Sequence, residues 1–160
     1  MNLPIPQEAL IDFLLQAKRR TYAAQGDQVS VTPLLLGARQ LEFQADPWLY
    51  RDIYFGFAYF VGQETVYYAE TPIWAMGYAG GMLDAKASPE VIGQVYGFLR
   101  AALRQVEPGR PYRGPRSYAS GIWTYLDETH GDLSTFWGLE TIVQAGASVY
   151  QLRYHGGHIR

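Results

Sequence analysis

The sequence predicts an α+β fold, in which one antiparallel sheet or two half-sheets carry two helices on one side. Three observations predict this fold: two amphipathic segments, aromatic and β-branched segments that lie between turn residues, and an internal repeat. The 160 residues fit a single domain, 1–160, with a first unit at about 6–87 and a second at about 88–160. We expect a pseudo-twofold axis to relate the units.

Residues 4–23 predict the first helix. Its apolar residues recur at helical spacing with polar residues opposite: Leu10, Phe13, Leu14 and Ala17. The basic run Lys18–Arg20 follows at the expected C-terminal end, where the helix dipole favours cations.

Residues 88–109 predict the second helix. Ser88 is a favourable N-cap, Pro89 suits the first helical position, and Pro108 and Gly109 end the helix. One apolar stripe runs between these ends: Val91, Ile92, Val95, Leu99, Ala102, Leu103 and Val106.

The segments after each helix read as strands, and they are repeated. Residues 60–83 align without a gap on residues 136–159, and residues 48–56 correspond to residues 123–131. The stretches "AETP" and "QAGAS" predict hairpin turns, so neighbouring strands are antiparallel. The expected order is one helix, three or four strands, a second helix and three strands. Eight of the 24 aligned pairs are identical: Phe60/Phe136, Gly62/Gly138, Glu64/Glu140, Thr65/Thr141, Ala69/Ala145, Tyr78/Tyr154, Gly80/Gly156 and Gly81/Gly157.

Strand alternation places the repeated residues on one aromatic face that includes four carboxylates. The carboxylates are Asp52, Glu64, Asp127 and Glu140. One interpretation makes this face a core, with Glu64 and Glu140 as structural acceptors. The other makes it a cleft on the pseudo-twofold axis, with the two glutamates at its base and their pKa raised by desolvation.

The candidate ligand-binding residues follow from the cleft interpretation, with Arg113 added from the turn "YRGPRS" as a group that could reach an anionic ligand. They are Glu64, Glu140, Trp74, Tyr78, Trp123, Tyr125, Tyr154 and Arg113. No catalytic residue is assigned. The Gly-Gly pairs indicate bends in the backbone rather than a phosphate-binding site. His155 and His158 lie at the end of a predicted strand, so we expect no metal site. We expect no cofactor.

Composition excludes several classes of protein. A formal net charge of −2 argues against nucleic-acid binding by the domain itself. No apolar run is long enough to span a membrane, and the N-terminal residues lack the pattern of a signal peptide. With no cysteine in the chain, we expect a cytoplasmic protein.

Several stretches together resemble a family of small bacterial domains of unknown function. They are "FLLQAKRRTYAAQG", "LEFQADPWLYRDIYFG", "FVGQETVYYAETPIWAMGYAGG", "PYRGP" and "VYQLRYHGG". Members of that family occur alone or C-terminal to helix-turn-helix domains of the phage-repressor (XRE) type. The resemblance implies the sensory half of a one-component regulator, whereas this chain is expected to lack the DNA-binding half because its first helix follows directly on residue 5.

These observations favour a module that binds a small organic ligand with a planar or cationic part. Cation–π contacts with Trp and Tyr, together with a buried Glu, would supply the recognition. Two alternatives stay open. One is a small hydrolase that uses Glu64 or Glu140 as a base, and the other is an interaction protein that forms a homodimer through its aromatic face.

Overall fold

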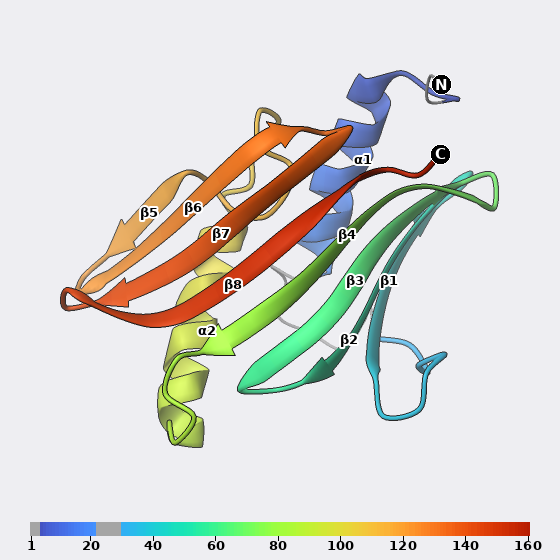
Figure 1. Ribbon diagram of the computed structural model, residues 1–160. Coiled ribbons are helices and arrows are strands. Elements are labelled where there is room, and N and C mark those ends of the chain that lie inside the picture. The colour runs from blue at the N-terminus through green and yellow to red at the C-terminus, as the bar shows by residue number, and fades with distance from the viewer. Residues whose placement is uncertain (1–3, 22–29) are drawn as a thin grey trace.

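The computed structural model describes residues 4–21 and 30–160, and in them the chain forms two helices on one antiparallel sheet of eight strands (Figure 1). The helices are α1 (Gln7–Arg20) and α2 (Pro89–Leu103). The first four strands are β1 (Arg39–Ala45), β2 (Trp48–Gly56), β3 (Tyr59–Tyr68) and β4 (Thr71–Met82). The last four are β5 (Ser117–Ser120), β6 (Trp123–Asp132), β7 (Thr135–Gln144) and β8 (Ala147–His158). This confirms the mixed architecture, in which strands predominate.

The sheet is continuous across the two predicted units, in the order β1-β2-β3-β4-β8-β7-β6-β5. β4 and β8 pair antiparallel at its centre, with Tyr78 opposite Tyr154. Of the two arrangements that the sequence left open, the structure therefore shows one sheet and not two half-sheets. Among the described residues, no helix is both long and apolar enough to cross a bilayer.

The prediction of three strands in the second unit is wrong, because β5 adds a fourth at the sheet edge. It pairs with β6 from Ser117 opposite Leu126 to Ser120 opposite Trp123. The strand is four residues long and mostly small and polar, so it carries no strand pattern in the sequence. Of the predicted first helix, 4–23, the structure shows Gln7–Arg20 as helical, and residues 22 and 23 lie outside the described part of the chain.

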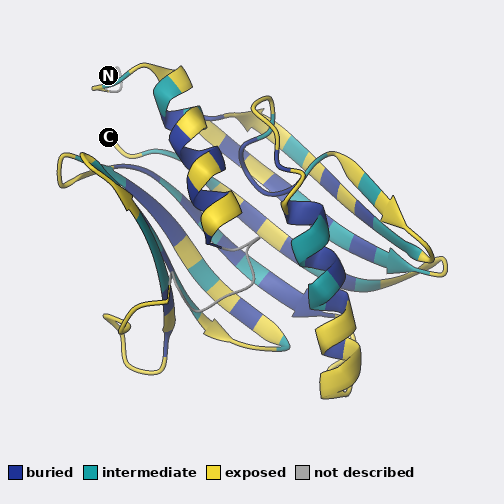
Figure 2. Cartoon of the chain, turned by 180° about the vertical axis from the view of Figure 1, so that it is seen from behind, coloured by how far each residue is buried: buried dark blue, intermediate teal, exposed yellow. Residues whose placement is uncertain are grey.

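Both helices lie on the same face of the sheet (Figure 2). In α1, Phe13 stacks on Trp48 with 4.9 Å between ring centroids. In α2, Phe98 stacks on Trp123 at 5.7 Å. Each helix therefore packs on a tryptophan at the start of a strand in its own unit. The predicted cap of α2 is present, because the Val91 N–H donates to the Ser88 hydroxyl at 3.3 Å.

The hairpins β3–β4 and β7–β8 have matching backbone irregularities. Each contains one register shift, which follows Val66 in the first hairpin and Ile142 in the second. Both turns contain an alanine in the left-handed region, Ala69 with φ 46° and Ala145 with φ 47°. The turns predicted from "AETP" and "QAGAS" are thus confirmed.

The predicted aromatic face is the inner face of the sheet, buried beneath the helices (dark blue in Figure 2). Its buried rings are Tyr50, Phe60, Trp74, Tyr78, Tyr125, Phe136, Tyr150 and Tyr154. The alternation assigned from sequence is therefore confirmed. Because the helices cover it, this face forms the core of the protein and is not an open cleft.

Candidate functional site

Four buried carboxylates lie on the inner face in two matched pairs. Asp52 lies opposite Glu64 on β2 and β3, and Asp127 lies opposite Glu140 on β6 and β7. Each of these residues is at most 2% exposed. A charged group is costly to bury unless it is paired, so the partners of each carboxylate determine its role.

Glu140, in the second unit, is fully paired. Arg113 donates to both of its oxygens, from Nη2 to Oε1 at 2.9 Å and from Nε to Oε2 at 3.1 Å. The hydroxyl groups of Tyr125 and Tyr150 donate to Oε2 at 2.7 Å and to Oε1 at 2.9 Å. The Tyr125 hydroxyl also accepts the Gly114 N–H at 3.0 Å. A bidentate arginine and two hydroxyl groups satisfy a buried carboxylate, which makes this a structural network.

Asp127 is also paired on both oxygens. The Tyr154 hydroxyl donates to Oδ1 at 2.8 Å, and Arg110 Nη2 lies 3.2 Å from Oδ2. Arg110 also donates to the backbone oxygen of Asp127 at 2.8 Å and to the Thr129 hydroxyl at 2.9 Å. Burial, and then the neighbouring Glu140 carboxylate, nevertheless raise the pKa of Asp127 to about 6.

Glu64, in the first unit, takes its main partner from α1. The Lys18 ammonium pairs with Oε2, and Arg113 Nη1 lies 3.9 Å from Oε1. Lys18 Nζ also lies 5.9 Å from the centroid of the Trp74 ring. Lys18 is only 5% exposed, and burial lowers its pKa even though Glu64 opposes this change. Helix α1 therefore holds a desolvated alkylammonium between a carboxylate and an aromatic ring.

Three fully buried polar atoms near Glu64 have no hydrogen-bond partner in the part of the chain that the structure describes. They are Tyr50 Oη, Asp52 Oδ2 and Trp74 Nε1. Their counterparts at the matching sheet positions of the second unit are all paired: Tyr125, Asp127 and Tyr150. An unsatisfied buried polar group costs about 1–3 kcal/mol. The polar network of the first unit is thus incomplete, whereas the groups at the matching positions of the second unit are all paired; in the second unit it is Arg110 Nε, beside Asp127, that lacks a partner among the described residues.

The protonation of this incomplete network is set by burial. The Tyr78 hydroxyl donates to Asp52 Oδ1 at 2.6 Å. Burial, and then the Glu64 carboxylate, raise the pKa of Asp52 to about 7. Burial, followed by Glu64 and Asp52, raises the pKa of Tyr50 well above its ordinary value. Near neutral pH the site therefore offers a neutral hydroxyl, an indole N–H and a carboxyl group that can gain or lose a proton.

The repeated Gly-x-Glu pattern explains how the tyrosines reach the aspartates. Tyr78 and Tyr154 each cross the glycine opposite them, Gly62 and Gly138, to bond the aspartate of their own unit. A Cβ at either glycine would collide with the tyrosine ring. The glycine admits the ring, and the glutamate two residues later points to the same face.

A pocket lined by Lys18, Glu64, Leu103 and Arg113 adjoins the incomplete network. Its volume is about 10 Å³, which is room for roughly one water molecule. Pockets that hold organic ligands measure roughly 300–1,000 Å³. Lys18 fills the space beside Glu64.

The family model of a domain of unknown function, DUF5680, matches residues 52–159, which is more than half of the chain. The chain belongs to this family. Neither the curated proteins nor the solved structures give a match. All four buried carboxylates fall inside the DUF5680 match, whereas α1 and β1 precede it.

In this DUF5680 chain, seven of the eight predicted site residues lie in or against the two networks. They are Glu64, Glu140, Trp74, Tyr78, Tyr125, Tyr154 and Arg113. Trp123 does not join them. It lies four residues before Asp127 on β6, about 13 Å along the strand, and it packs on Phe98. Arg113, expected to reach an anionic ligand, instead binds Glu140.

Sequence reasoning missed two cations of the DUF5680 site, Lys18 and Arg110. Lys18 carried a signal, because it lies four residues after Leu14 and next to Ala17, on the apolar side of the helix. Its long side chain could equally have turned to solvent, so the basic run was assigned to the helix dipole. Arg110 carried no such signal in the sequence, since it lies in the irregular segment between α2 and β5.

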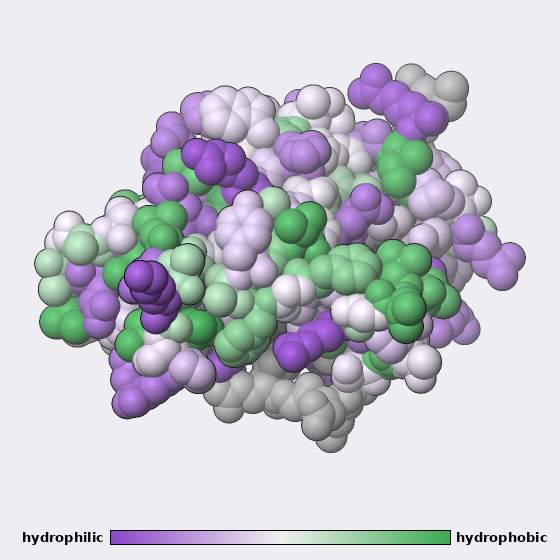
Figure 3. Space-filling view, turned by 60° about the horizontal axis from the view of Figure 1, so that its bottom comes forward, coloured by the Kyte–Doolittle hydropathy of each residue, from purple (hydrophilic) through white to green (hydrophobic). Residues whose placement is uncertain are grey.

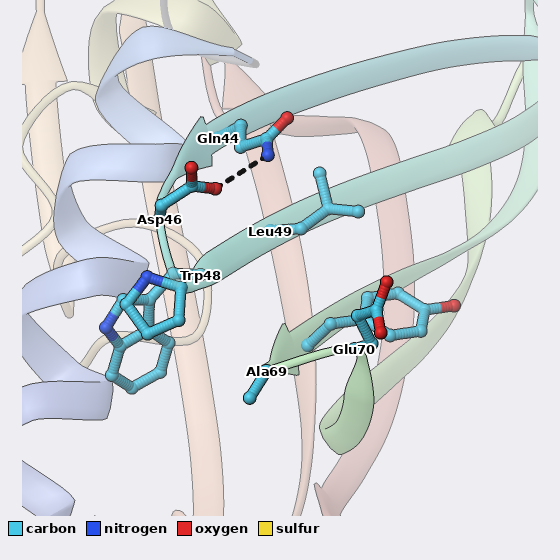
Figure 4. Close-up of a pocket in the computed structure, with 8 residues that line it drawn as sticks. Gln44, Asp46, Trp48, Leu49, Ala69 and Glu70 are labelled. Atoms are coloured by element: carbon cyan, nitrogen blue, oxygen red, sulfur yellow. Dashed lines mark hydrogen bonds between the residues drawn. The ribbon is translucent and has the colours of Figure 1, made fainter.

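Two larger hollows of the DUF5680 chain lack these buried charges. One, of about 500 Å³, lies between the β1–β2 and β3–β4 turns and includes Trp48 and Leu49 (Figure 4). Its carboxylates, Asp46 and Glu70, are exposed, and Gln44 donates to Asp46 at 2.8 Å. Because these groups keep their water, they have no need of a ligand partner.

The other hollow is an apolar groove of about 420 Å³ on the outer face, over β2 and β3. Figure 3 shows hydrophobic side chains gathered on this side of the molecule. Those that line the groove are Leu34, Leu35, Ile53, Phe55 and Val61. Arg51, the cation at this groove, is paired with Glu42 at 2.7 Å.

Proposed function

We propose that the protein is a small-molecule-binding module whose site lies in the first unit, around Glu64, Asp52, Tyr50 and Trp74. The observation that carries this proposal is the contrast between the units: three buried polar atoms lack partners in one, and their counterparts have partners in the other. A ligand that reached these atoms would supply the missing hydrogen bonds and remove the cost of leaving them unsatisfied. The surrounding aromatic rings would form its apolar walls.

The second unit has a different role in this proposal. Glu140 is satisfied by Arg113, Tyr125 and Tyr150, so it holds the sheet and the segment after α2 together. Glu64 is therefore the ligand anchor, and Glu140 supports the site through Arg113, which bridges the two glutamates.

The proposal includes an origin by duplication. The matching register shifts, the matching turns and the pairing of Tyr78 with Tyr154 support two copies of one unit about a pseudo-twofold axis. One copy kept a closed structural network and the other opened its network for binding. The resemblance to domains found beside helix-turn-helix modules supports a sensory role in the cytoplasm of a bacterium.

A ligand screen tests the proposal. Trp74 is fully buried beside Glu64, so tryptophan fluorescence should report binding. Wild type and Glu64→Gln are titrated with a library of planar and aliphatic compounds that are cationic, neutral or anionic. We expect at least one saturable response in wild type that Glu64→Gln weakens by about tenfold or more, since one charged hydrogen bond is worth about 1.5–3 kcal/mol. Glu128→Gln, on the exposed face of β6, serves as the control.

The absence of any saturable response in wild type would contradict the proposal. Equal binding by wild type and Glu64→Gln would place the ligand elsewhere, with the outer groove over β2 and β3 as the first alternative.

One observation favours a second candidate, a small hydrolase. Asp52 has a pKa raised to about 7 and one unpartnered oxygen, which are the properties of a general base at neutral pH. Asp52 would take this role in place of Glu64 or Glu140, which are paired with cations. If a hydrolysed substrate is found, Asp52→Asn should abolish turnover while leaving substrate binding measurable.

A further inference from the structure

Helix α1 shows which chemical group the site beside Glu64 accepts. Lys18 ends in an ammonium on an alkyl arm, and the structure places that ammonium against Glu64 and over the Trp74 ring. A carboxylate, an aromatic face and exclusion of water are together the features that bind organic ammonium ions. The first unit thus contains a formed ammonium site, which is filled by the protein's own side chain.

Arg113 does not replace Lys18 in this role. Its guanidinium is held by both oxygens of Glu140 and reaches Glu64 only at 3.9 Å. If Lys18 withdrew, Glu64 would lose its closest cation, and the unpaired Asp52 Oδ2 and the Tyr50 hydroxyl would remain near that carboxylate. A buried carboxylate in that state strongly favours a replacement cation.

The size of the pocket requires such a withdrawal. About 10 Å³ is available beside Lys18, Glu64 and Arg113, too little for any organic molecule. Lys18 lies in the last turn of α1, where Arg19 Nη2 donates to the Val106 oxygen at 3.0 Å, Ala17 is buried in the core, and Lys18 lies beside Leu103 of α2. A ligand can therefore enter by displacing one ammonium and the end of one helix.

Resting on the proposed function, we infer that the ligands of this site are alkylammonium compounds that compete with Lys18 for Glu64, so that α1 is an internal competitor. Binding displaces the Lys18 ammonium and frees the C-terminal turn of α1. The affinity of the free site is reduced in wild type by the competition and is recovered when Lys18 is removed.

The test uses Lys18→Met, which keeps an unbranched side chain but removes the charge, with N,N-dimethylbutylammonium chloride as the probe. Lys18→Met should melt below wild type, because Glu64 loses its cation. The probe should raise its melting temperature saturably toward that of wild type, whereas n-butanol and sodium chloride at equal concentration should not. The double variant Lys18→Met/Glu64→Gln should show no such rise, since the carboxylate that pairs with the ammonium has been removed.

A second measurement on wild type decides the matter if Lys18→Met does not fold. The chain has two lysines, Lys18, which is buried, and Lys86, which is exposed. Acylation of both is followed by mass spectrometry while the probe is added, because a tertiary amine forms no stable acyl product. The ratio of Lys18 to Lys86 labelling should rise saturably as the probe displaces Lys18.

The inference is overturned if the probe stabilises the single and double variants equally, or if n-butanol does as well as the probe. It is also overturned if the labelling ratio does not change. Any of these three results, together with a neutral or anionic compound that binds in a Glu64-dependent manner, would leave the proposed function standing and remove only the assignment of the ligand class.

Discussion

Tyr50 and Tyr125 occupy matching positions on β2 and β6, and both are fully buried, yet their hydroxyl groups differ in their partners. The Tyr125 hydroxyl donates to Glu140 and accepts from the Gly114 N–H. The Tyr50 hydroxyl makes no hydrogen bond of comparable geometry among the described residues, although the Glu64 carboxylate lies close enough to raise its pKa. The same chemical group is therefore fully bonded at one position and lacks a well-formed hydrogen bond at the other, which is the contrast on which the proposed ligand site rests.

Removing each hydroxyl should have consequences of different size for stability. Tyr125→Phe leaves a buried N–H unsatisfied and takes one bond from Glu140, so the free energy of unfolding should fall by about 2–4 kcal/mol. Tyr50→Phe removes an unsatisfied group and should change it by less than about 1 kcal/mol, with either sign. Urea unfolding followed by circular dichroism measures both. Equal losses in the two variants would show that the networks do not differ.

The two aspartates make stability depend on pH. Their pKa values in the folded protein, about 7 for Asp52 and about 6 for Asp127, lie above the ordinary 3.8. The folded state therefore binds their protons more tightly than the unfolded state. This contribution to stability is fully present below 3.8 and is lost as the pH rises through 6 to 7.

We expect the free energy of unfolding to fall between about pH 4 and 7, by up to about 1.4 kcal/mol per pH unit for each group, and to level off above the folded pKa values. Asp52→Asn cannot ionise, so the decline should be shallower in that variant and should end near pH 6, where only Asp127 contributes. Urea unfolding at several pH values checks this, and a wild-type slope that persists unchanged in Asp52→Asn would show that Asp52 is not responsible.

Among the strands, β3 and β7 depend on a glycine that lets a tyrosine cross. Gly138→Ala would push a Cβ into the Tyr154 ring, and the ring could then no longer reach Asp127. We expect a loss of about 1–3 kcal/mol, as for other overpacked core positions. Gly97→Ala in α2, where a Cβ meets nothing within 4 Å, is the matched control and should stabilise by about 0.5–1 kcal/mol. Thermal unfolding measures both variants, and melting temperatures that shift in the same direction would contradict this explanation of the glycine.

The sequence predicted both helices, the main hairpins and the buried face because these are properties of local spacing. Alternation alone places Glu64 and Asp52 with the aromatic rings, and the N-cap at Ser88 is read directly. The sequence did not predict Lys18 as the partner of Glu64, because that pairing depends on how α1 lies across the sheet. Nor did it distinguish the units, since Tyr50 and Tyr125 look alike until their partners are known.

For the molecule as a whole, one continuous sheet joins the two units, with α1 over the first carboxylate pair and the segment after α2 over the second. This arrangement places a closed network beside an incomplete one, with Arg113 between Glu64 and Glu140. Superposition of residues 48–83 on residues 123–159 in an experimental structure stays a prediction of the duplication. The hairpins should match closely, with the main differences at Lys18 and Arg110.

The central claim is that the first unit binds a ligand while the second holds the fold. Titration of the ligand found in the screen against Tyr50→Phe and Tyr125→Phe tests it most directly. The predicted result is an affinity about tenfold lower in Tyr50→Phe, since one hydrogen bond to the ligand is lost, and an unchanged affinity in folded Tyr125→Phe. An unchanged affinity in Tyr50→Phe, or a larger loss in Tyr125→Phe than in Tyr50→Phe, would contradict the assignment of the site to the first unit.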